Sequence, residues 1–388
     1  MTTKLGSVLV TEAAQKNTLA IVRALGSAGV KVYVLGHHRM DISRFSRYCN
    51  GSLLIDSLDR EIIATFIESN SIDLVIPVGT NSIQFFVEHH LFFANKVKSL
   101  LPNSEQVSCA MSKQLTMEAA NTLKIPTPKT FFPASLEDAY RHAEAIGFPC
   151  VMKWLYEVGE NVVDYAQTKE EFINRYDSMC RIHGFDEKTG FPMVQEFVDG
   201  VGVGYFGLFF KGKHIDSYQH ERIREAPPSG GVSACAKTVY YDDLEKYGES
   251  LLTHLKWNGV AMVEFKMRHD KSLVLMEVNP KFWGSLDLGL KAGINFPLTI
   301  IKLLTTPQMS DSIGHSDYPR EFRFQWPLDG EIKYMFASYA RFKEVIKDFF
   351  NPNVRSNLNL LSDPLPTLVQ VLSILVLKIR SVFRGLIK

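Results

Sequence analysis

Glu277 and Asn279 lie two residues apart at the end of an apolar segment that begins at Leu273. Side chains two apart on a strand point to the same face of a sheet, so the carboxylate and the carboxamide are expected to lie together. Glu264 sits in a second apolar run, 260–265, and pairing of the two strands could place it beside Glu277. Three such oxygen donors suit Mg²⁺, which prefers carboxylate and carbonyl oxygens together with nucleotide phosphates. The sequence therefore predicts a metal site of Glu264, Glu277 and Asn279.

The alternative interpretation is a pair of surface acids on two half-exposed strands. The flanking residues disfavour it, because they are too apolar for a solvated strand: Val263, Phe265, Met276 and Val278. A buried acid is also costly unless it has a partner, which favours a bound cation.

The segment from Glu277 to Ser285 reads Glu-x-Asn-Pro-x-Phe-x-Gly-Ser and resembles the metal-binding strand end of the ATP-grasp superfamily. Glu264 matches the other metal-ligand position of that family. The resemblance covers residues 1–305 and extends to ligases similar to carbamoyl phosphate synthetase. It implies that these residues hold Mg²⁺, with Mn²⁺ as an expected substitute, against the phosphates of ATP.

Composition and length place the chain among ordinary globular proteins. Its 388 residues are too many for one typical core and indicate two or three domains. A net charge of +1 and the lack of a basic tract predict no nucleic-acid partner. Five scattered cysteines without a CxxC pair favour a reducing compartment over a disulfide framework or a zinc site. The N-terminus shows no signal-peptide apolar region, so a cytoplasmic location is expected.

Residues 1–105 alternate short apolar strands with helices, which predicts a parallel sheet with helices on its faces. The expected strands are 7–11, 30–36, 53–55 and 74–78, and the expected helices are 17–29 and 60–69. The segment after the first strand lacks glycine, so no dinucleotide site is predicted there. By the resemblance this is a Rossmann-like pre-ATP-grasp domain.

The segment Pro77–Ser82 follows the fourth expected strand and permits two interpretations. In ATP-grasp proteins the strand ends of this domain often contact the second substrate, so the segment is a candidate for such contacts. Alternatively it is an ordinary strand-to-helix turn with Thr80 or Asn81 as the N-cap.

The resemblance assigns residues 106–305 to a two-lobed α+β ATP-grasp domain with a lobe break near 193. It places Lys113, at the start of an expected helix, against the nucleotide phosphates. Lys153 ends an apolar strand, and an inward lysine there needs a partner such as a triphosphate. The next segment, 155–161, is a glycine-rich lid in the family but has one glycine and two acids here. Closure of the lid in the usual way is therefore in question.

The segment Met193–Gly200 looks like the part of ATP-grasp proteins that reads adenine. The resemblance implies that Gln195 or Glu196 accepts a hydrogen bond from the exocyclic amine, and that backbone near Phe197 and Val198 pairs with the ring edge. The string GxGxxG at 202–207 is not a Rossmann fingerprint, because a strand follows it instead of a helix. Many relatives carry an acid near position 202 for the ribose, and this chain has glycine.

His220, Arg222 and Arg224 alternate after an expected hairpin turn at 211–213, so on a strand they would share one face. Such a face suits an anionic ligand, such as a carboxylate substrate or an acyl phosphate. The alternative is an exposed basic edge strand that guards against aggregation. Lys281 stands where many relatives carry arginine. The residues predicted to be catalytic are Lys153, Arg222, Arg224 and Lys281.

Residues 306–388 lie outside the resemblance and are expected to form a helical extension. Its last part, 365–388, reads as one helix with 13 uncharged residues followed by a basic end without acids. That apolar stretch is short of the roughly 20 residues needed to span a bilayer. The helix could lie in a membrane interface on the inner face of the membrane, or dock on the body or a partner subunit.

The leading functional hypothesis is an ADP-forming ligase that joins a small-molecule carboxylate to an amine or thiol through an acyl phosphate. Such catalysis depends on positioning and electrostatic stabilisation and needs no covalent nucleophile. A second hypothesis is a non-catalytic ATP-binding regulatory module at a membrane surface. A third changes the reaction to phosphoryl transfer to an alcohol, or to carboxylation, which the lack of a biotin-carrier motif makes least favoured. Dimers are common in the family, so a homodimer is also open.

Overall fold

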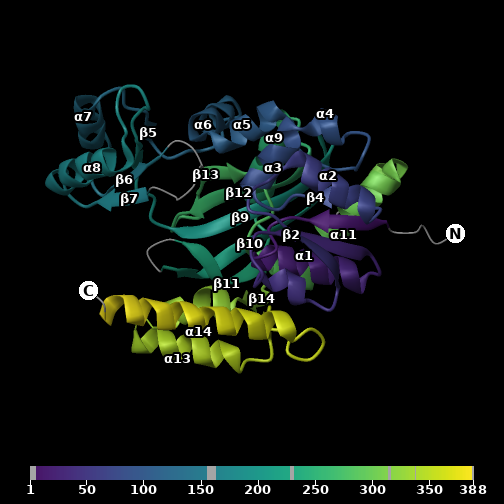
Figure 1. Cartoon of the computed structure of the whole chain (residues 1–388). Coiled ribbons are helices and arrows are strands. Elements are labelled where there is room, and N and C mark those ends of the chain that lie inside the picture. The colour runs from purple at the N-terminus through teal and green to yellow at the C-terminus, as the bar shows by residue number, and fades with distance from the viewer. Residues whose placement is uncertain (1–5, 155–162, 228–230, 313–315, 337, 387–388) are drawn as a thin grey trace.

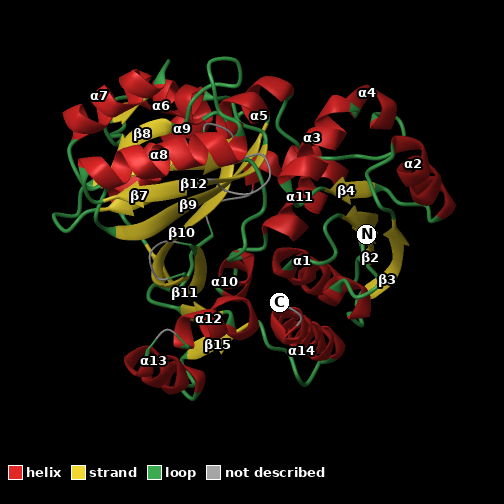
Figure 2. Ribbon diagram, turned by 60° about the vertical axis from the view of Figure 1, so that its left-hand side comes forward, coloured by secondary structure: helices red, strands yellow, loops and turns green. Residues whose placement is uncertain are grey.

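The computed structural model of the chain describes residues 6–154, 163–227, 231–312, 316–336 and 338–386. Within these ranges the strands form one parallel sheet near the N-terminus and two mainly antiparallel sheets (Figure 1). Helices lie on the faces of the parallel sheet and over the antiparallel sheets (Figure 2). This is the predicted α/β class with two further sheets for the two lobes.

The N-terminal sheet has the strand order β3-β2-β1-β4, and all its pairs are parallel. Its strands are β1 (Ser7–Val10), β2 (Lys31–Gly36), β3 (Cys49–Leu54) and β4 (Leu74–Ile76). Its helical segments are α1 (Lys16–Ser27), η1 (Ile42–Phe45), α2 (Arg60–Ser69), α3 (Thr80–Glu88) and α4 (His90–Phe93). The predicted parallel sheet is confirmed, and α2 has the predicted bounds because the Asp59 carboxylate caps its first turn.

The smaller antiparallel sheet has the order β5-β8-β6-β7. Its strands are β5 (Thr130–Phe131), β6 (Cys150–Lys153), β7 (Val163–Ala166) and β8 (Met193–Glu196). Helices α7 (Leu136–Ile146) and α8 (Lys169–His183) pack against this sheet, whereas α5 (Ser104–Met111) and α6 (Lys113–Thr122) pack against the larger sheet (Figure 1). The Ser112 hydroxyl accepts from the Leu115 backbone N–H and caps α6, which places Lys113 in its first turn.

The larger sheet has the order β13-β12-β9-β10-β11-β14-β15. Its first five strands in chain order are β9 (Val201–Phe210), β10 (Lys213–Ala226), β11 (Val232–Val239), β12 (Gly259–Met267) and β13 (Leu273–Asn279). The helices next to them are α9 (Asp242–His254), α10 (Leu286–Lys291) and α11 (Phe296–Thr305). The predicted hairpin turn lies between β9 and β10, where Lys211 and Gly212 both have positive φ as a type I′ turn requires.

The predicted helical extension also supplies strands to the larger sheet. Its elements are η2 (Pro307–Ser312), β14 (Arg323–Gln325), η3 (Pro327–Glu331), α12 (Ile332–Met335), α13 (Tyr339–Phe349), β15 (Val354–Ser356) and α14 (Leu365–Leu386). Strand β14 pairs antiparallel with β11, and β15 pairs parallel with β14. The extension is therefore continuous with the sheet that carries the acids Glu264 and Glu277.

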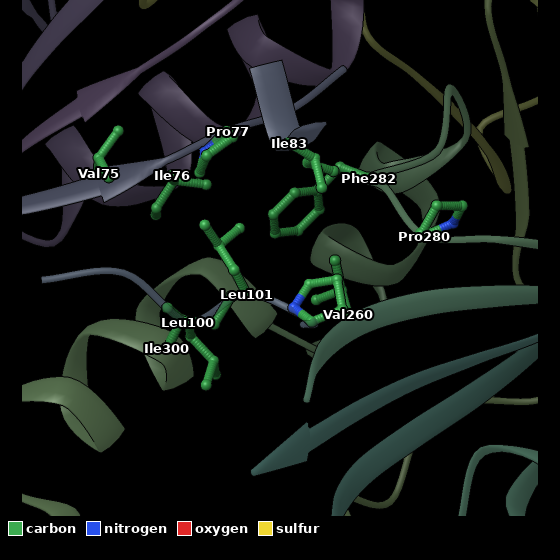
Figure 3. A pocket seen from close by; sticks show the side chains of 11 residues that line it. Val75, Ile76, Pro77, Ile83, Leu100, Leu101, Val260, Pro280, Phe282 and Ile300 are labelled. Atoms are coloured by element: carbon green, nitrogen blue, oxygen red, sulfur yellow. The ribbon is translucent and has the colours of Figure 1, made fainter. Parts of the chain in front are cut away.

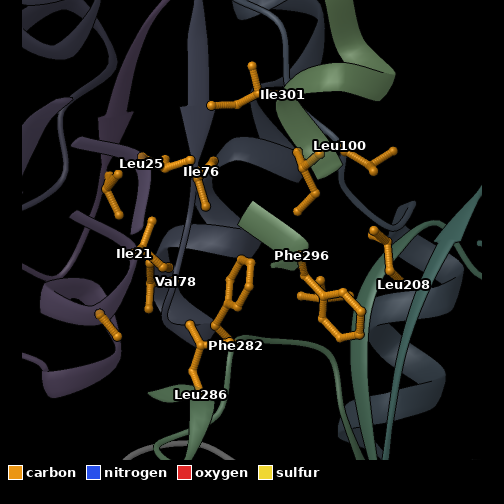
Figure 4. Packing of buried hydrophobic residues seen from close by; sticks show 14 of the residues in the cluster. Ile21, Leu25, Ile76, Val78, Leu100, Leu208, Phe282, Leu286, Phe296 and Ile301 are labelled. Atoms are coloured by element: carbon orange, nitrogen blue, oxygen red, sulfur yellow. The ribbon is translucent and has the colours of Figure 1, made fainter. Parts of the chain in front are cut away.

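One hydrophobic core joins the N-terminal sheet to the larger sheet. Ile21 and Leu25 of α1 and Ile76 of β4 belong to the same buried cluster as Leu208 of β9 and Phe282 (Figure 4). Burial of apolar area at roughly 25 cal/mol per Å² is the main attraction between such layers. The segment after Asn279 is thus held by the N-terminal domain as well as by its own sheet.

A narrow cavity lies at this seam, between the end of β4 and the start of β12. Its lining includes Pro77, Leu100, Val260 and Pro280, and all of its lining side chains are apolar (Figure 3). A binding site for a polar substrate needs a few convergent polar groups, and this lining supplies no polar side chain. We therefore assign the cavity to packing.

Helix α14 docks on the N-terminal domain through one face. Val369 is buried against Leu19 and Ile42, and the Asp363 carboxylate just before the helix accepts from Arg23 Nε at 2.8 Å. This supports the interpretation that the helix packs on the body of the protein. Among the residues that the structure describes, no helix is both long and apolar enough to cross a membrane.

Candidate active site

Glu264 and Glu277 lie directly opposite each other on the antiparallel strands β12 and β13. Directly opposed residues of antiparallel strands have neighbouring side chains. The predicted juxtaposition is therefore present. Asn279 lies two residues further along β13, and its Nδ2 donates to Glu277 Oε1 at 3.0 Å. The flanking side chains Val263 and Val278 are buried, so the acids are not part of a solvated strand.

Three cationic side chains surround the two carboxylates. Arg222 on β10 contacts Glu264 Oε1 through its NH2 atom at 2.7 Å. Lys113 of α6 places its Nζ 3.8 Å from Glu277 Oε2. Lys153 at the end of β6 donates from Nζ to Gln195 Oε1 at 3.0 Å and interacts electrostatically with both acids. The structure thus brings together residues from both antiparallel sheets at one place.

The surroundings change the pKa of Glu264, Glu277 and Lys153. Burial raises the pKa of Glu264; Arg222 opposes this effect and the neighbouring Glu277 adds to it. Burial also acts to raise the pKa of Glu277, but Lys113, the Asn279 hydrogen bond and Lys153 outweigh it, so that pKa is lowered. Burial lowers the pKa of Lys153, with Glu277 acting in the opposite direction. Glu277 is therefore the acid more firmly held as a carboxylate.

The donor set fits a magnesium ion. It contains two carboxylates and one amide oxygen, from Glu264, Glu277 and Asn279, and Mg²⁺ in nucleotide sites is usually bound by one or two carboxylates plus phosphates. Among the described residues, no cluster of three or more His, Cys, Asp or Glu side chains forms a closed metal cage. The set is thus an open one that leaves coordination positions for phosphate oxygens and water.

Arg222 is held between two acids, and one of them was not predicted. Its NH1 atom donates to Glu225 Oε1 at 3.0 Å while NH2 contacts Glu264. Gly202 on the neighbouring strand makes room for it, because a Cβ there would lie 2.8 Å from Arg222 Cδ. The glycine of the GxGxxG string thus serves packing of the arginine, in line with the expectation that the string is not a nucleotide loop.

The prediction that Arg224 joins Arg222 on a ligand-binding face is wrong. The pairing of β10 with β11 is irregular between Arg222 and Glu225, which breaks the simple alternation of faces. The Arg224 guanidinium is buried and contacts Glu331, Glu344 and Asp348 of the C-terminal extension at 2.6, 3.1 and 2.6 Å. Arg224 is therefore committed to holding the extension.

His220 does not lie on the predicted ligand-binding face either. It is buried in edge-to-face contact with Phe206, with 4.5 Å between ring centroids, and neither ring nitrogen has a hydrogen-bond partner. Burial lowers its pKa well below the ordinary value, and the charge of Arg222 acts in the same direction. Neither the expected shared face nor the alternative of an exposed basic edge strand describes these three residues.

The adenine segment lies at the end of β8, and both of its predicted side-chain acceptors already have partners. Gln195 accepts from Lys153 and donates to Thr130 Oγ1 at 2.9 Å. The Glu196 carboxylate accepts from the Lys129 backbone N–H at 3.1 Å and from Arg268 at 2.8 Å. Recognition of adenine by these side chains therefore does not fit the structure. Recognition by backbone near Phe197 and Val198 remains a prediction.

Two predictions concern residues near the remaining edge of the site. Lys281 lies half-buried in the turn that follows β13, and its contact with a phosphoryl group stays a prediction. The predicted lid, 155–161, lies outside the described residues.

The segment Pro77–Ser82 contains an acid contact that the sequence analysis missed. The Glu12 carboxylate, from the loop after β1, accepts from the backbone N–H groups of Val78 and Gly79 at 3.3 and 2.9 Å. It also bonds the Ser82 hydroxyl. The N-cap is Gly79, so capping by Thr80 or Asn81 was a wrong expectation, and Glu12 satisfies the helix N-terminus instead.

A family model matches residues of this site, and a curated relative matches part of the chain. The family model "ATP-grasp in the biosynthetic pathway with Ter operon" matches residues 221–323, which include Arg222, Glu264, Glu277 and Asn279. The carbamoyl phosphate synthase large chain of Helicobacter pylori (strain ATCC 700392 / 26695) is 26% identical over 166 residues. That match covers 41% of this chain, which spans only 15% of the relative's length.

Solved structures share the architecture at low sequence identity. The biotin carboxylase domain dimer of Hydrogenobacter thermophilus 2-oxoglutarate carboxylase, in complex with MgADP, ADP and bicarbonate, matches with a TM-score of 0.62 and 15% identity. The match covers 81% of this chain and 71% of that one. An L-amino acid ligase from Bacillus licheniformis matches with a TM-score of 0.58 and 14% identity, covering 78% and 74%. At such identities the likeness establishes the fold.

Proposed function

We propose, from the premise that this chain belongs to the ATP-grasp superfamily, that it is an ATP- and Mg²⁺-dependent ligase. It joins a carboxylate to an amine or thiol through an acyl phosphate and releases ADP and phosphate. The observation that carries the proposal is the opposed carboxylate pair Glu264 and Glu277, with Asn279 beside it and three cations around it. A cluster of both signs at one site suits a metal–triphosphate complex.

Glu264, Glu277 and Asn279 are the residues that would hold Mg²⁺. When bound, the ion neutralises charge on the phosphates and lets their oxygens complete its coordination. The lowered pKa of Glu277 keeps that side chain ready as a carboxylate ligand without prior loss of a proton. The raised pKa of Glu264 makes that residue the more acid-sensitive of the two.

Lys113, Lys153 and Lys281 supply positive charge for the transferring phosphoryl group. Lys153 reaches the site from β6, where its Nζ donates to the neutral Gln195 amide oxygen at 3.0 Å. Burial lowers its pKa, and a bound phosphate would favour its charged form. Arg222, oriented between Glu225 and Glu264, is proposed to bind the carboxylate substrate or the acyl phosphate. Arg224 is left out of the catalytic set because its guanidinium contacts the acids of the C-terminal extension and not those of the site.

The proposed reaction has two balanced steps. An oxygen of the substrate carboxylate forms a bond to the γ-phosphorus as the bond between that phosphorus and the bridging oxygen breaks, which releases ADP. The amine nitrogen then attacks the acyl carbon, phosphate leaves with the electron pair of the carbon–oxygen bond, and the nitrogen loses its proton to phosphate or water. Positioning and charge stabilisation account for both steps without a covalent enzyme intermediate.

The L-amino acid ligase likeness supports the choice of a carboxylate and an amine as the substrate class. The biotin carboxylase likeness supports ATP with Mg²⁺ as the nucleotide complex. Adenine is proposed to bind at backbone near Phe197 and Val198, because the neighbouring side chains Gln195 and Glu196 are engaged.

Hydroxylamine trapping tests the proposal. Purified protein is incubated with ATP, Mg²⁺, hydroxylamine and single members of a panel of amino acids and uronic acids, and hydroxamate and ADP are both quantified. We expect hydroxamate and ADP in equal amounts from one acid. Glu277→Gln should give neither product, whereas Glu187→Gln, an exposed acid of the β7–β8 connection, should match the wild type.

The alternative is a non-catalytic ATP-binding module, and one observation favours it. Arg222 and Lys113 already neutralise the two acids, an arrangement that could replace the metal. In that case ATP binds equally well with Mg²⁺ or with EDTA, and the panel yields no ADP from any acid. That pair of results would replace the ligase proposal.

A further inference from the structure

Helices α13 and α14 expose apolar side chains that ordinary helix packing would bury. On α13 these are Tyr339, Phe342, Ile346, Phe349 and Phe350, between 37% and 76% exposed. Their spacing of three, four and seven residues places them on one stripe of the helix. An apolar stripe of this kind usually faces a core or a partner.

Helix α14 repeats the pattern with aliphatic residues. Its exposed side chains are Leu365, Leu368, Val371, Leu372, Leu375 and Val376, between 37% and 55% exposed. The face turned to the body includes the buried Val369 and Gln370, whose Nε2 donates to Asp329 Oδ1 at 2.7 Å. Over its described side chains α14 thus directs its more apolar face outward.

The two helices lie at the same end of the molecule in both views, side by side below β11 and β14 in Figure 1, with α14 under α1 in Figure 2. The linker before α14 adds Leu360 and Leu361, which are 60% and 98% exposed. We call the exposed apolar residues of α13, of the linker and of α14 the apolar end.

Bases outnumber acids beside the apolar end. On α13, Lys343 and Lys347 are exposed, whereas Asp348 is buried against Arg224 and the partly exposed Glu344 also contacts Arg224. The sequence of α14 and the two residues after it contains no acid and has four bases: Lys378, Arg380, Arg384 and Lys388. Among the described side chains of α13 the two exposed lysines thus face one exposed acid, Glu344, which is paired with Arg224, and the sequence of α14 adds only bases.

We propose that the apolar end is a peripheral binding surface for anionic lipid membranes. Aliphatic and aromatic side chains can enter the boundary between headgroups and acyl chains, while the bases attract anionic headgroups. A second copy of this chain is the less suitable occupant, because a symmetric contact would bring two basic helices together. The proposal is independent of the ligase reaction, since α13 and α14 contribute none of the proposed catalytic residues.

Vesicle co-sedimentation of the full chain tests the proposal. We expect binding to phosphatidylcholine vesicles that contain phosphatidylglycerol and little binding to phosphatidylcholine alone. High salt should weaken the binding, because the screening length falls from about 10 Å at 0.1 M to about 3 Å at 1 M.

Two sets of variants separate the apolar and the charged contributions. Leu368→Ser, Leu372→Ser and Leu375→Ser combined should weaken vesicle binding at least about 100-fold. Lys343→Gln with Lys347→Gln should weaken it about 30-fold. The matched controls are Leu91→Ser and Ile182→Ser, which remove exposed aliphatic residues elsewhere, at 80% and 74% exposure, and should bind like the wild type.

Circular dichroism and ATP affinity must stay unchanged in all variants, so that lost binding is not lost folding. Failure of the folded full chain to bind anionic vesicles overturns the proposal, as does equal binding by the leucine variant. Light scattering tests the other occupant, a second copy of the chain. A wild-type dimer that does not bind vesicles and that the leucine variant abolishes would show that the apolar end is an interface between copies.

Discussion

At the scale of single residues, the two acids of the candidate site have different proton affinities. Glu277 accepts a hydrogen bond from Asn279 and lies near Lys113. Glu264 forms an ion pair with Arg222 and is close to the negative charge of Glu277. The pKa is lowered for Glu277 and raised for Glu264. We therefore expect Glu277 to be the more important ligand at neutral and mildly acidic pH.

Glu277→Gln should lower ATP turnover by at least about 100-fold, because it removes one negative ligand from the proposed metal site. The size and the hydrogen-bonding capacity of the side chain are nearly kept, so the melting temperature without ligand should change little. ADP release and a thermal melt measure the two effects. A wild-type rate in this variant would remove the metal assignment.

Asp287 offers a separate test of pH dependence. It is a buried carboxyl in α10, and burial raises its pKa to about 6, partly opposed by the hydrogen bond from Trp326 Nε1 at 3.3 Å. In the unfolded chain an aspartate titrates near 3.9, so the folded state binds the proton more tightly. The stability from this group is fully present below the unfolded pKa and is lost as pH rises through about 6.

Between pH 5 and pH 7.5 the loss from Asp287 should amount to roughly 1.4 kcal/mol. Asp287→Asn has no such titration, so its free energy of unfolding should fall less than that of the wild type over this interval. Urea titrations at the two pH values measure the difference. Parallel pH profiles for the two proteins would show that Asp287 is not the group responsible.

At the scale of elements, β10 connects the candidate site with the C-terminal extension. Arg222 contacts Glu264 in the site, and Arg224 two residues later contacts η3 and α13 through Glu331, Glu344 and Asp348. A buried charge is costly without its partners, so this cluster depends on Arg224. The irregular pairing of β10 with β11 allows two neighbouring arginines to serve two places.

Arg224→Met should destabilise the protein by about 3–5 kcal/mol, because it leaves buried carboxylates without a counter-charge. Hydrogen exchange should rise first in 331–350. A triple variant that adds Glu331→Gln and Asp348→Asn should recover much of the stability. Arg355→Met, at an exposed position of β15, is the matched control and should be neutral. Equal effects at positions 224 and 355 would contradict the assignment.

At the scale of the whole molecule, the candidate site lies between two sheets. Lys153 comes with the smaller sheet, whereas Arg222, Glu264 and Glu277 belong to the larger sheet and Lys113 lies on α6, which packs against the larger sheet. A ligand that contacts residues from both sheets should couple the motions of the two lobes. Such coupling is expected whether or not the apolar end binds membranes.

MgATP at 100 times its dissociation constant should stabilise the folded protein by about 2.7 kcal/mol. Hydrogen exchange should slow in both β6 and β13, since each supplies residues to the site. ATP with EDTA should protect less than MgATP. Protection confined to one of the two sheets would indicate that the nucleotide does not bridge the lobes.

The sequence by itself determined the features that depend on local periodicity and on short motifs. The placement of Glu277 and Asn279 on one strand face follows from the two-residue repeat, and the apolar flanks indicated burial. Parallel strands alternating with helices followed from the same patterns in residues 1–105. The start of α6 at Lys113 also follows locally, from the capping hydroxyl of Ser112.

Only the tertiary structure decided which distant groups each side chain contacts. Arg224 meets Glu331 and Asp348 more than 100 residues later in the chain, and Glu12 reaches the N-terminus of α3 across the sheet. Gln195 turns to Lys153 instead of an adenine position. Local pattern sets the face on which a side chain lies, but its partner depends on how separate segments pack, and that packing is a property of the whole chain.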